Sequence, residues 1–171
     1  MDKKVKLFGL VSIVALLVVF GLLAIPQFIV SIKTGAEHPV YIMGYQFFFK
    51  AYSDVFSKGH SISGVSGVGI TAIVLMVLAL ASFLFARKSS AFLMLGGILN
   101  VVASVMFFVM VASKNKVFGV DRELVSVLWV TYVCGALLVL TGLISIYIAF
   151  KSMRQERKVI ATSKSYSYLK K

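Results

Sequence analysis

The chain has 171 residues, of which 60% are hydrophobic, and its mean hydropathy is +0.97. This composition excludes an ordinary soluble domain built around a single core. A formal net charge of +12 would favour a nucleic-acid partner in a soluble protein. Here the basic residues flank long apolar runs, so they indicate membrane topology, and we predict no nucleic-acid partner.

Four apolar runs are each long enough to cross a hydrocarbon layer about 30 Å thick, which takes roughly 20 helical residues. None contains Asp, Glu, His, Lys or Arg, and they cover residues 7–32, 65–86, 91–113 and 125–150. Backbone groups in lipid need partners within their own segment, so we predict helices; the alternation typical of a transmembrane barrel is absent. The predicted fold is an all-α integral membrane protein, an antiparallel bundle of four transmembrane helices.

The distribution of charge predicts the topology of this bundle. With a cytoplasmic N-terminus, the outer side carries only six of the 18 Lys and Arg residues: Lys33, Lys50, Lys58, Lys114, Lys116 and Arg122. Cytoplasmic loops carry the excess of basic residues, so we predict that both termini are cytoplasmic and that the membrane is the plasma membrane. Residues 1–150 then form the membrane domain. Residues 151–171 form a basic tail that contacts anionic headgroups of the inner leaflet through Lys151, Arg154, Arg157 and Lys158.

An external loop, residues 33–64, separates the first two runs. Its aromatic residues recur at intervals of four, three, four and four, which is typical of one helical face: Tyr41, Tyr45, Phe48, Tyr52 and Phe56. We expect a short aromatic helix that caps the bundle; a hairpin turning at Gly44 and a segment lying in the headgroup layer are the alternatives. An aromatic cap also suits a docking partner, and the predicted external contact residues are Tyr41, Tyr45, Phe48, Phe49 and Tyr52.

Small and polar residues form a stripe on each of the last two predicted helices. Small residues let helix backbones approach, and a buried amide finds a hydroxyl or carbonyl group across the contact. We therefore expect helix-packing or pore-lining positions at Gly96, Asn100, Ser104, Thr131, Gly135, Thr141, Gly142 and Ser145.

The residue types present argue against proton-coupled transport, disulfide chemistry, metal binding and catalysis. No predicted helix contains an ionisable residue of the kind that proton relays and coupled transporters need. The single cysteine, Cys134, cannot form an internal disulfide. The loop residues His38 and His60, with Glu37 and Asp54, lack the close spacing of a metal site. We predict no metal, no cofactor and no catalytic residue.

The order of a long first outer loop, a short inner turn, a short outer loop and a basic inner tail resembles the tetraspan layout of claudins and related proteins. The resemblance is one of topology. The tryptophan and paired cysteines that define the first outer loop of claudins are missing, because the only tryptophan is Trp129 and the only cysteine is Cys134. No residue role is therefore transferred.

The expected function is that of a non-enzymatic multi-pass membrane protein, a scaffold or an accessory subunit of a membrane complex, with other membrane subunits or further copies of itself as partners. The alternative is a homo-oligomeric channel or uncoupled carrier lined by the polar residues of the last two helices. A third class is an enzyme at the outer face, acting through Asp54, His60 or Asp121.

Overall fold

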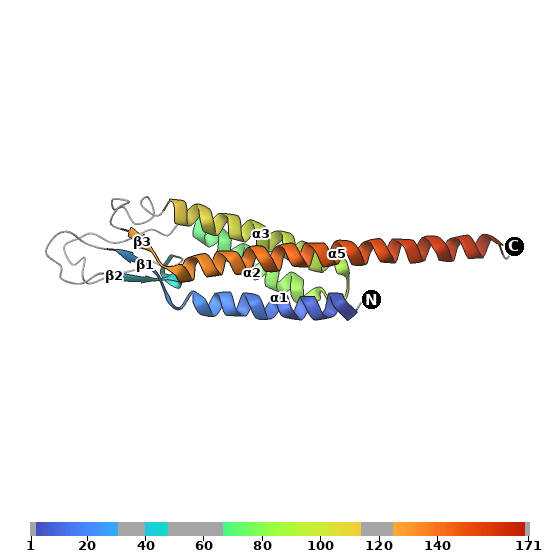
Figure 1. Ribbon diagram of the computed structural model, residues 1–171, viewed down its shortest axis with the longest axis horizontal. Coiled ribbons are helices and arrows are strands. Elements are labelled where there is room, and N and C mark those ends of the chain that lie inside the picture. Colours follow the sequence, from blue (N-terminus) through green and yellow to red (C-terminus); the bar gives the residue numbers. More distant parts are fainter. Residues whose placement is uncertain (1–2, 31–39, 48–66, 114–124, 170–171) are drawn as a thin grey trace.

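The computed structural model describes residues 3–30, 40–47, 67–113 and 125–169 of the chain. Four long helices lie side by side, and a small sheet covers one end of them, which we call the sheet end (Figure 1). The helices are α1 (Lys3–Leu22), α2 (Gly67–Phe85), α3 (Ser90–Ala112) and α5 (Trp129–Leu169). The other elements are β1 (Pro26–Val30), β2 (Val40–Met43), the 3₁₀ turn η1 (Gly44–Phe47) and β3 (Val125–Val127).

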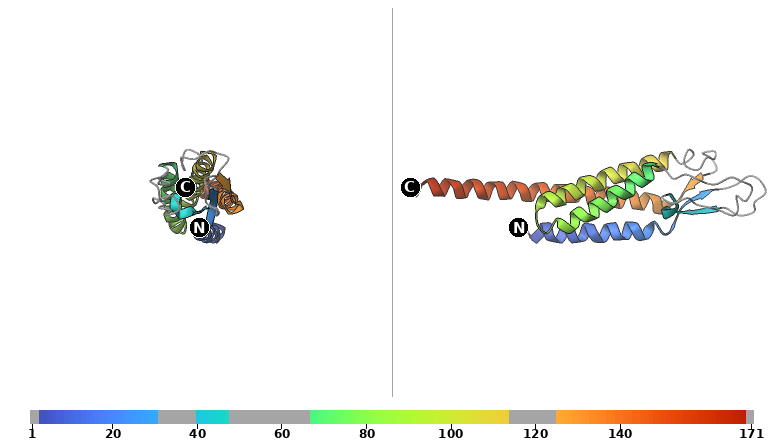
Figure 2. Two further views of the ribbon diagram at one scale, coloured as in Figure 1. Left: turned by 90° about the vertical axis from the view of Figure 1, so that its left-hand side faces the viewer. Right: turned by 180° about the vertical axis from the view of Figure 1, so that it is seen from behind.

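All four helices are long and apolar enough to cross a membrane, and in α5 the segment that meets this criterion is Trp129–Arg157. Consecutive helices run in opposite directions, and the described part of the N-terminus lies at the end opposite the sheet (Figures 1 and 2). At that opposite end, α2 and α3 are joined by a short turn. Helix α3 begins there because the Ser89 hydroxyl accepts a hydrogen bond from the Ala91 amide at 3.2 Å and so caps its first turn.

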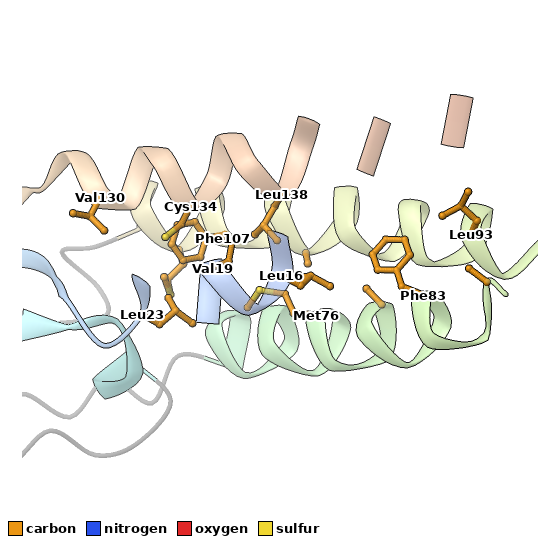
Figure 3. Packing of buried hydrophobic residues seen from close by; sticks show 14 of the residues in the cluster. Leu16, Val19, Leu23, Met76, Phe83, Leu93, Phe107, Val130, Cys134 and Leu138 are labelled. Carbon is orange, nitrogen blue, oxygen red and sulfur yellow. The ribbon is translucent and has the colours of Figure 1, made fainter. Parts of the chain in front are cut away.

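The buried faces of the helices follow a seven-residue pattern. On α1 the buried residues alternate at steps of four and three: Val5, Gly9, Ser12, Leu16 and Val19. The same alternation on α2 buries Ala72, Met76, Ala79 and Phe83. Such spacing produces the shallow crossing of neighbouring helices in a bundle. Helix α3 packs against α2 and α5, and α1 packs against α5 and α2, which closes one core around Leu16, Met76, Phe107 and Leu138 (Figure 3).

The first apolar run is not a single helix to residue 32. Helix α1 ends at Leu22, a turn follows, and Pro26 begins strand β1. Proline lacks the amide that would continue the helical ladder and clashes with the preceding turn. The residues that follow, Phe28, Ile29 and Val30, suit a strand as well as an apolar helix. Twenty residues remain in α1, about the number that a bilayer core requires.

Strand β1 is the central strand of an antiparallel sheet with the order β2-β1-β3. Its two neighbours lie far apart in the sequence, since β2 follows the first helix and β3 precedes the last. The backbone groups of residues 26–30 therefore find partners in other strands rather than in their own segment. This pairing explains how a strand stands where the sequence predicts a lipid-spanning helix.

The expected aromatic helix is also wrong over the described residues 40–47. These residues form strand β2 and the 3₁₀ turn η1, and β2 pairs with β1 instead of folding into a hairpin about Gly44. Phe48, Phe49, Tyr52 and Phe56 lie outside the described residues, as do both histidines.

The last apolar run begins with a strand, and its helix is longer than predicted. Residues 125–127 form β3, and α5 begins at Trp129. The helix has 41 residues and is therefore about 60 Å long, roughly twice the thickness of a hydrocarbon core. Its C-terminal part extends well past the other three helices (Figures 1 and 2). The predicted tail is thus a continuation of the same helix as far as Leu169.

Candidate functional site

The sheet has one face on the bundle and one exposed face. In β1, Phe28 stands opposite Ile42 of β2 and Val127 of β3; Phe28 and Ile42 are fully buried and belong to the core cluster. The next residue, Ile29, stands opposite Tyr41 and Ser126. Successive side chains of a strand point to opposite faces, so this second row forms the outward face. Tyr41 there is 54% exposed.

Further exposed aromatic side chains lie near the sheet end. Tyr45 of η1 is 47% exposed, and at the start of α5 Trp129 is 70% and Tyr132 is 54% exposed. We call Tyr41, Tyr45, Trp129 and Tyr132 the aromatic rim. Two of the five predicted contact residues, Tyr41 and Tyr45, are therefore placed by the structure.

Gln27 joins the sheet to two helices. Its side chain is fully buried at a register shift between Pro26 and Phe28, and its Nε2 donates to the carbonyl oxygens of Leu22 at 2.9 Å and Ile25 at 3.3 Å. Its backbone oxygen accepts hydrogen bonds from the Leu128 amide and from the Thr131 Oγ1, both at 2.9 Å. One residue thus connects the end of α1, the central strand and the start of α5.

Gly44 allows β2 to cross the end of α1 closely. A Cβ atom at this position would lie 2.8 Å from both the Cα and the carbonyl oxygen of Leu23. The following amide, that of Tyr45, donates to the same carbonyl oxygen at 3.0 Å. Because the obstructing atoms belong to the backbone, any other residue would push the two segments apart.

Within the bundle, a polar seam links α3 to α5. The Asn100 Nδ2 donates to the Leu138 carbonyl oxygen at 3.2 Å and to the Thr141 Oγ1 at 2.8 Å. One turn further along, the Ser104 hydroxyl donates to the Gly135 carbonyl oxygen at 3.2 Å. Asn100 and Ser104 are fully buried, and the Asn100 Oδ1 has no hydrogen-bond partner within the described part of the chain.

The glycines on these helices permit close contacts of different kinds. A Cβ at Gly142 would lie 2.9 Å from the Gly97 carbonyl oxygen, and a Cβ at Gly97 would lie 2.8 Å from the Gly142 carbonyl oxygen. The two residues therefore mark the point where the backbones of α3 and α5 approach each other. Gly135 instead accommodates the ring of Phe108, and Gly96 faces α2, where a Cβ would lie 2.6 Å from the Phe83 ring.

The remaining predicted polar residues have other partners. Ser145 forms a buried 2.9 Å hydrogen bond with Ser12 of α1, and Thr131 donates to Gln27 in the sheet. The predicted packing or lining set is therefore not one stripe. Asn100, Ser104 and Thr141 meet at the α3–α5 contact, while Thr131 and Ser145 face other elements.

Among the predicted headgroup residues, Lys151, Arg154 and Arg157 are exposed on α5 just beyond its uncharged segment, and the side chain of Lys158 lies outside the described set. Sequence reasoning missed the structural roles of Gln27 and Gly97. For Gln27 a signal existed: it is the one amide side chain in the first apolar run, and it directly follows that run's proline. Gly97 stands beside another glycine, and nothing in the sequence shows which neighbouring helix each of the two contacts.

Within the described ranges, no three His, Cys, Asp or Glu side chains gather closely enough to hold a metal ion. Glu37, His38, Asp54, His60 and Asp121, from which the weaker metal and enzyme alternatives were built, all lie outside those ranges. Cys134 is free and buried in the core. No model of a known protein family matches this chain, and comparison with curated proteins likewise gives no match.

Proposed function

We propose that this multi-pass membrane protein is a non-enzymatic scaffold or accessory subunit, which binds a partner at the outer surface of the plasma membrane through the aromatic rim. The observation that carries the proposal is the exposed face of the sheet. Tyr41 stands on strand β2, whose other face is part of the core. Tyrosine and tryptophan on a rigid support are the residues that contribute most to protein interfaces.

The charge distribution supports this orientation. Lys3, Lys4 and Lys6 begin α1 at the end opposite the sheet, and Arg87 and Lys88 lie in the turn at that same end. By the positive-inside rule this end is cytoplasmic, so the sheet is external. Trp129 at the start of α5 then lies at headgroup depth on the outer side, a position that tryptophan favours.

The interior of the bundle supports a structural role for its polar residues. Ser12, Ser104 and Ser145 are buried, and each forms a hydrogen bond to a neighbouring helix. Hydrogen bonds of this kind contribute roughly 0.6–2 kcal/mol each to helix association. A packing role therefore accounts for these three serines without requiring a transport path or a catalytic site.

Photocrosslinking tests the partner proposal. With p-benzoylphenylalanine in place of Tyr41, we expect a single discrete adduct with another membrane protein in intact cells. The matched control places the same photoreactive residue at Tyr147, which is 65% exposed but lies near the other end of the membrane span. Addition of Tyr45→Ala should weaken the Tyr41 adduct severalfold. Equal labelling from both positions, or adducts with lipid alone, would contradict the proposal.

A channel is the second candidate, favoured by one observation: the Asn100 Oδ1 is a buried acceptor without a partner in the described structure. A polar path needs such acceptors. If the seam only packs helices, liposomes containing the purified protein should show no ion flux above that of empty liposomes. Asn100→Leu removes two hydrogen bonds and should then lower the free energy of unfolding by about 1–3 kcal/mol. A flux abolished by Asn100→Leu in folded protein would replace the scaffold proposal with the channel.

A further inference from the structure

A hollow of about 400 Å³ opens between α3 and α5 at the cytoplasmic end of the bundle as oriented above. Its described lining comprises Met94 from α3 and Phe150, Met153, Arg154 and Arg157 from α5. The α5 residues recur at steps of three, one and three, so they share one face of the helix. The hollow therefore has an apolar part, formed by two methionines and a phenylalanine, next to two guanidinium groups.

The position of the hollow matches the boundary between acyl chains and headgroups. Phe150 is the last residue of an uncharged stretch that begins at Val125, and Lys151 is the first charged residue of α5. Phe150 lines the hollow at the edge of the bundle, and 60% of its surface is exposed. An apolar side chain here meets the part of an acyl chain nearest the headgroup, while the arginines about one and two turns further along reach the phosphate layer.

The charges around the hollow select an anionic ligand. Arg154 and Arg157 are three residues apart on one helix, a spacing that lets two side chains meet at one group. Guanidinium groups bind phosphate oxygens in pairs of parallel hydrogen bonds. Lys151, Arg87 and Lys88 add positive charge at the same end, and among the described residues there Glu156 is the acidic one; it is exposed and does not line the hollow.

From this arrangement we propose that the hollow binds one anionic phospholipid of the inner leaflet. Its phosphate is held by Arg154 and Arg157, and one acyl chain lies over Phe150, Met153 and Met94. The inference rests on the proposed membrane orientation for the choice of leaflet, and it does not depend on the partner at the aromatic rim. It also replaces non-specific attraction between a basic tail and anionic lipids with one defined binding site for one lipid molecule.

Native mass spectrometry of the full-length protein, titrated with dioleoyl phosphatidylglycerol or dioleoyl phosphatidylcholine in detergent, tests the proposal. We expect the first phosphatidylglycerol to bind at least about tenfold more tightly than phosphatidylcholine. Two basic residues near a surface account for roughly a 30-fold change in affinity, so Arg154→Gln with Arg157→Gln should weaken the first binding step by about that factor. Both residues are exposed, and circular dichroism and gel filtration should show an unchanged fold.

The matched control is Arg87→Gln with Lys88→Gln, which removes the same charge at the same end but outside the described lining of the hollow. It should leave the first binding step within about twofold of the parent. Met94→Trp keeps every charge and fills the apolar part, so it should weaken phosphatidylglycerol binding severalfold. Equal losses in both charge variants, or no effect of Met94→Trp, would show general attraction to basic charge and overturn the proposal.

A competition experiment distinguishes a lipid from a free phosphate. Glycerol 3-phosphate carries the phosphate without the acyl chains, so at the same concentration it should not displace bound phosphatidylglycerol. Efficient displacement would assign the site to a soluble phosphate compound and overturn the lipid proposal. Lipid binding is measured on purified protein without any partner. A negative result would therefore overturn the lipid proposal alone and would not bear on the crosslinking test of the aromatic rim.

Discussion

Gly142→Leu is expected to destabilise the bundle by about 3 kcal/mol, the largest effect among the glycine substitutions in α5. The new Cβ would lie 2.7 Å from the Val101 Cγ2 and 2.9 Å from the Gly97 carbonyl oxygen. A side chain can rotate away, but a backbone oxygen moves only if the two helices separate. Separation would also break the Asn100 hydrogen bonds to Leu138 and Thr141. The free energy of unfolding, followed by circular dichroism during titration with sodium dodecyl sulfate in mixed micelles, measures the effect.

The control for this substitution is Gly21→Leu on α1. Gly21 is exposed, and a Cβ there would have no neighbour within 4 Å among the described residues. Its free energy of unfolding should stay within about 0.5 kcal/mol of the parent, the usual range for surface changes. Gly142→Ala places the same Cβ in the contact. Adding Val101→Ala to Gly142→Ala should restore only part of the stability that Gly142→Ala loses, because the Gly97 carbonyl oxygen remains. Full recovery would show that α3 and α5 do not approach at these backbones.

Gly44→Val is expected to detach β2 from β1 while leaving the four helices folded. The Cβ would overlap the Leu23 backbone at 2.8 Å, where neither the Cα nor the oxygen can move without unwinding the end of α1. An overlap of this kind costs about 2 kcal/mol, which corresponds to a change of roughly 30-fold in the population of the paired sheet. In cells we also expect weaker crosslinking from Tyr41, since β2 would no longer hold this residue against β1.

A disulfide formed across the two strands reports this pairing directly. Ile29 and Tyr41 stand opposite each other, so Ile29→Cys with Tyr41→Cys should oxidise readily in a Cys134→Ser background. Gly44→Val should lower the yield at least severalfold, whereas Gly67→Val, at a site with no described neighbour within 4 Å, should not. An unchanged yield in the Gly44 variant would mean that β2 does not cross the end of α1 as described.

The sheet changes how this small bundle is held together. Strand β1 follows α1 directly and pairs with β3, which precedes α5, so the first and last helices are fastened at their sheet ends by hydrogen bonds. Gln27 and Thr131 add a second connection at the same point. A partner that binds the outward face of the sheet therefore contacts an element joined to both helices.

The sequence by itself was enough to predict a mostly helical chain with four segments long and apolar enough to cross a membrane. A long uncharged apolar run can avoid unsatisfied backbone groups in lipid by forming a helix, so composition and length sufficed to locate α2 and α3 to within a few residues. The ends of α1 and α5 were not determined in this way. Residues 26–30 and 125–127 are as apolar as the helices they adjoin, and hydropathy does not distinguish a strand from a helix in such short runs.

Only the tertiary structure decided which elements those residues join. Strands need partners distant in sequence, and the pairing of residues near 28, 42 and 127 depends on α1 and α5 lying side by side. The tertiary structure also determined the partners of the polar residues. A small and polar stripe on one helix shows that this face is buried, but it does not show which neighbouring element packs against it. Asn100 therefore meets α5, Gly96 meets α2, and Thr131 meets the sheet, although the sequence places all three on similar small and polar stripes.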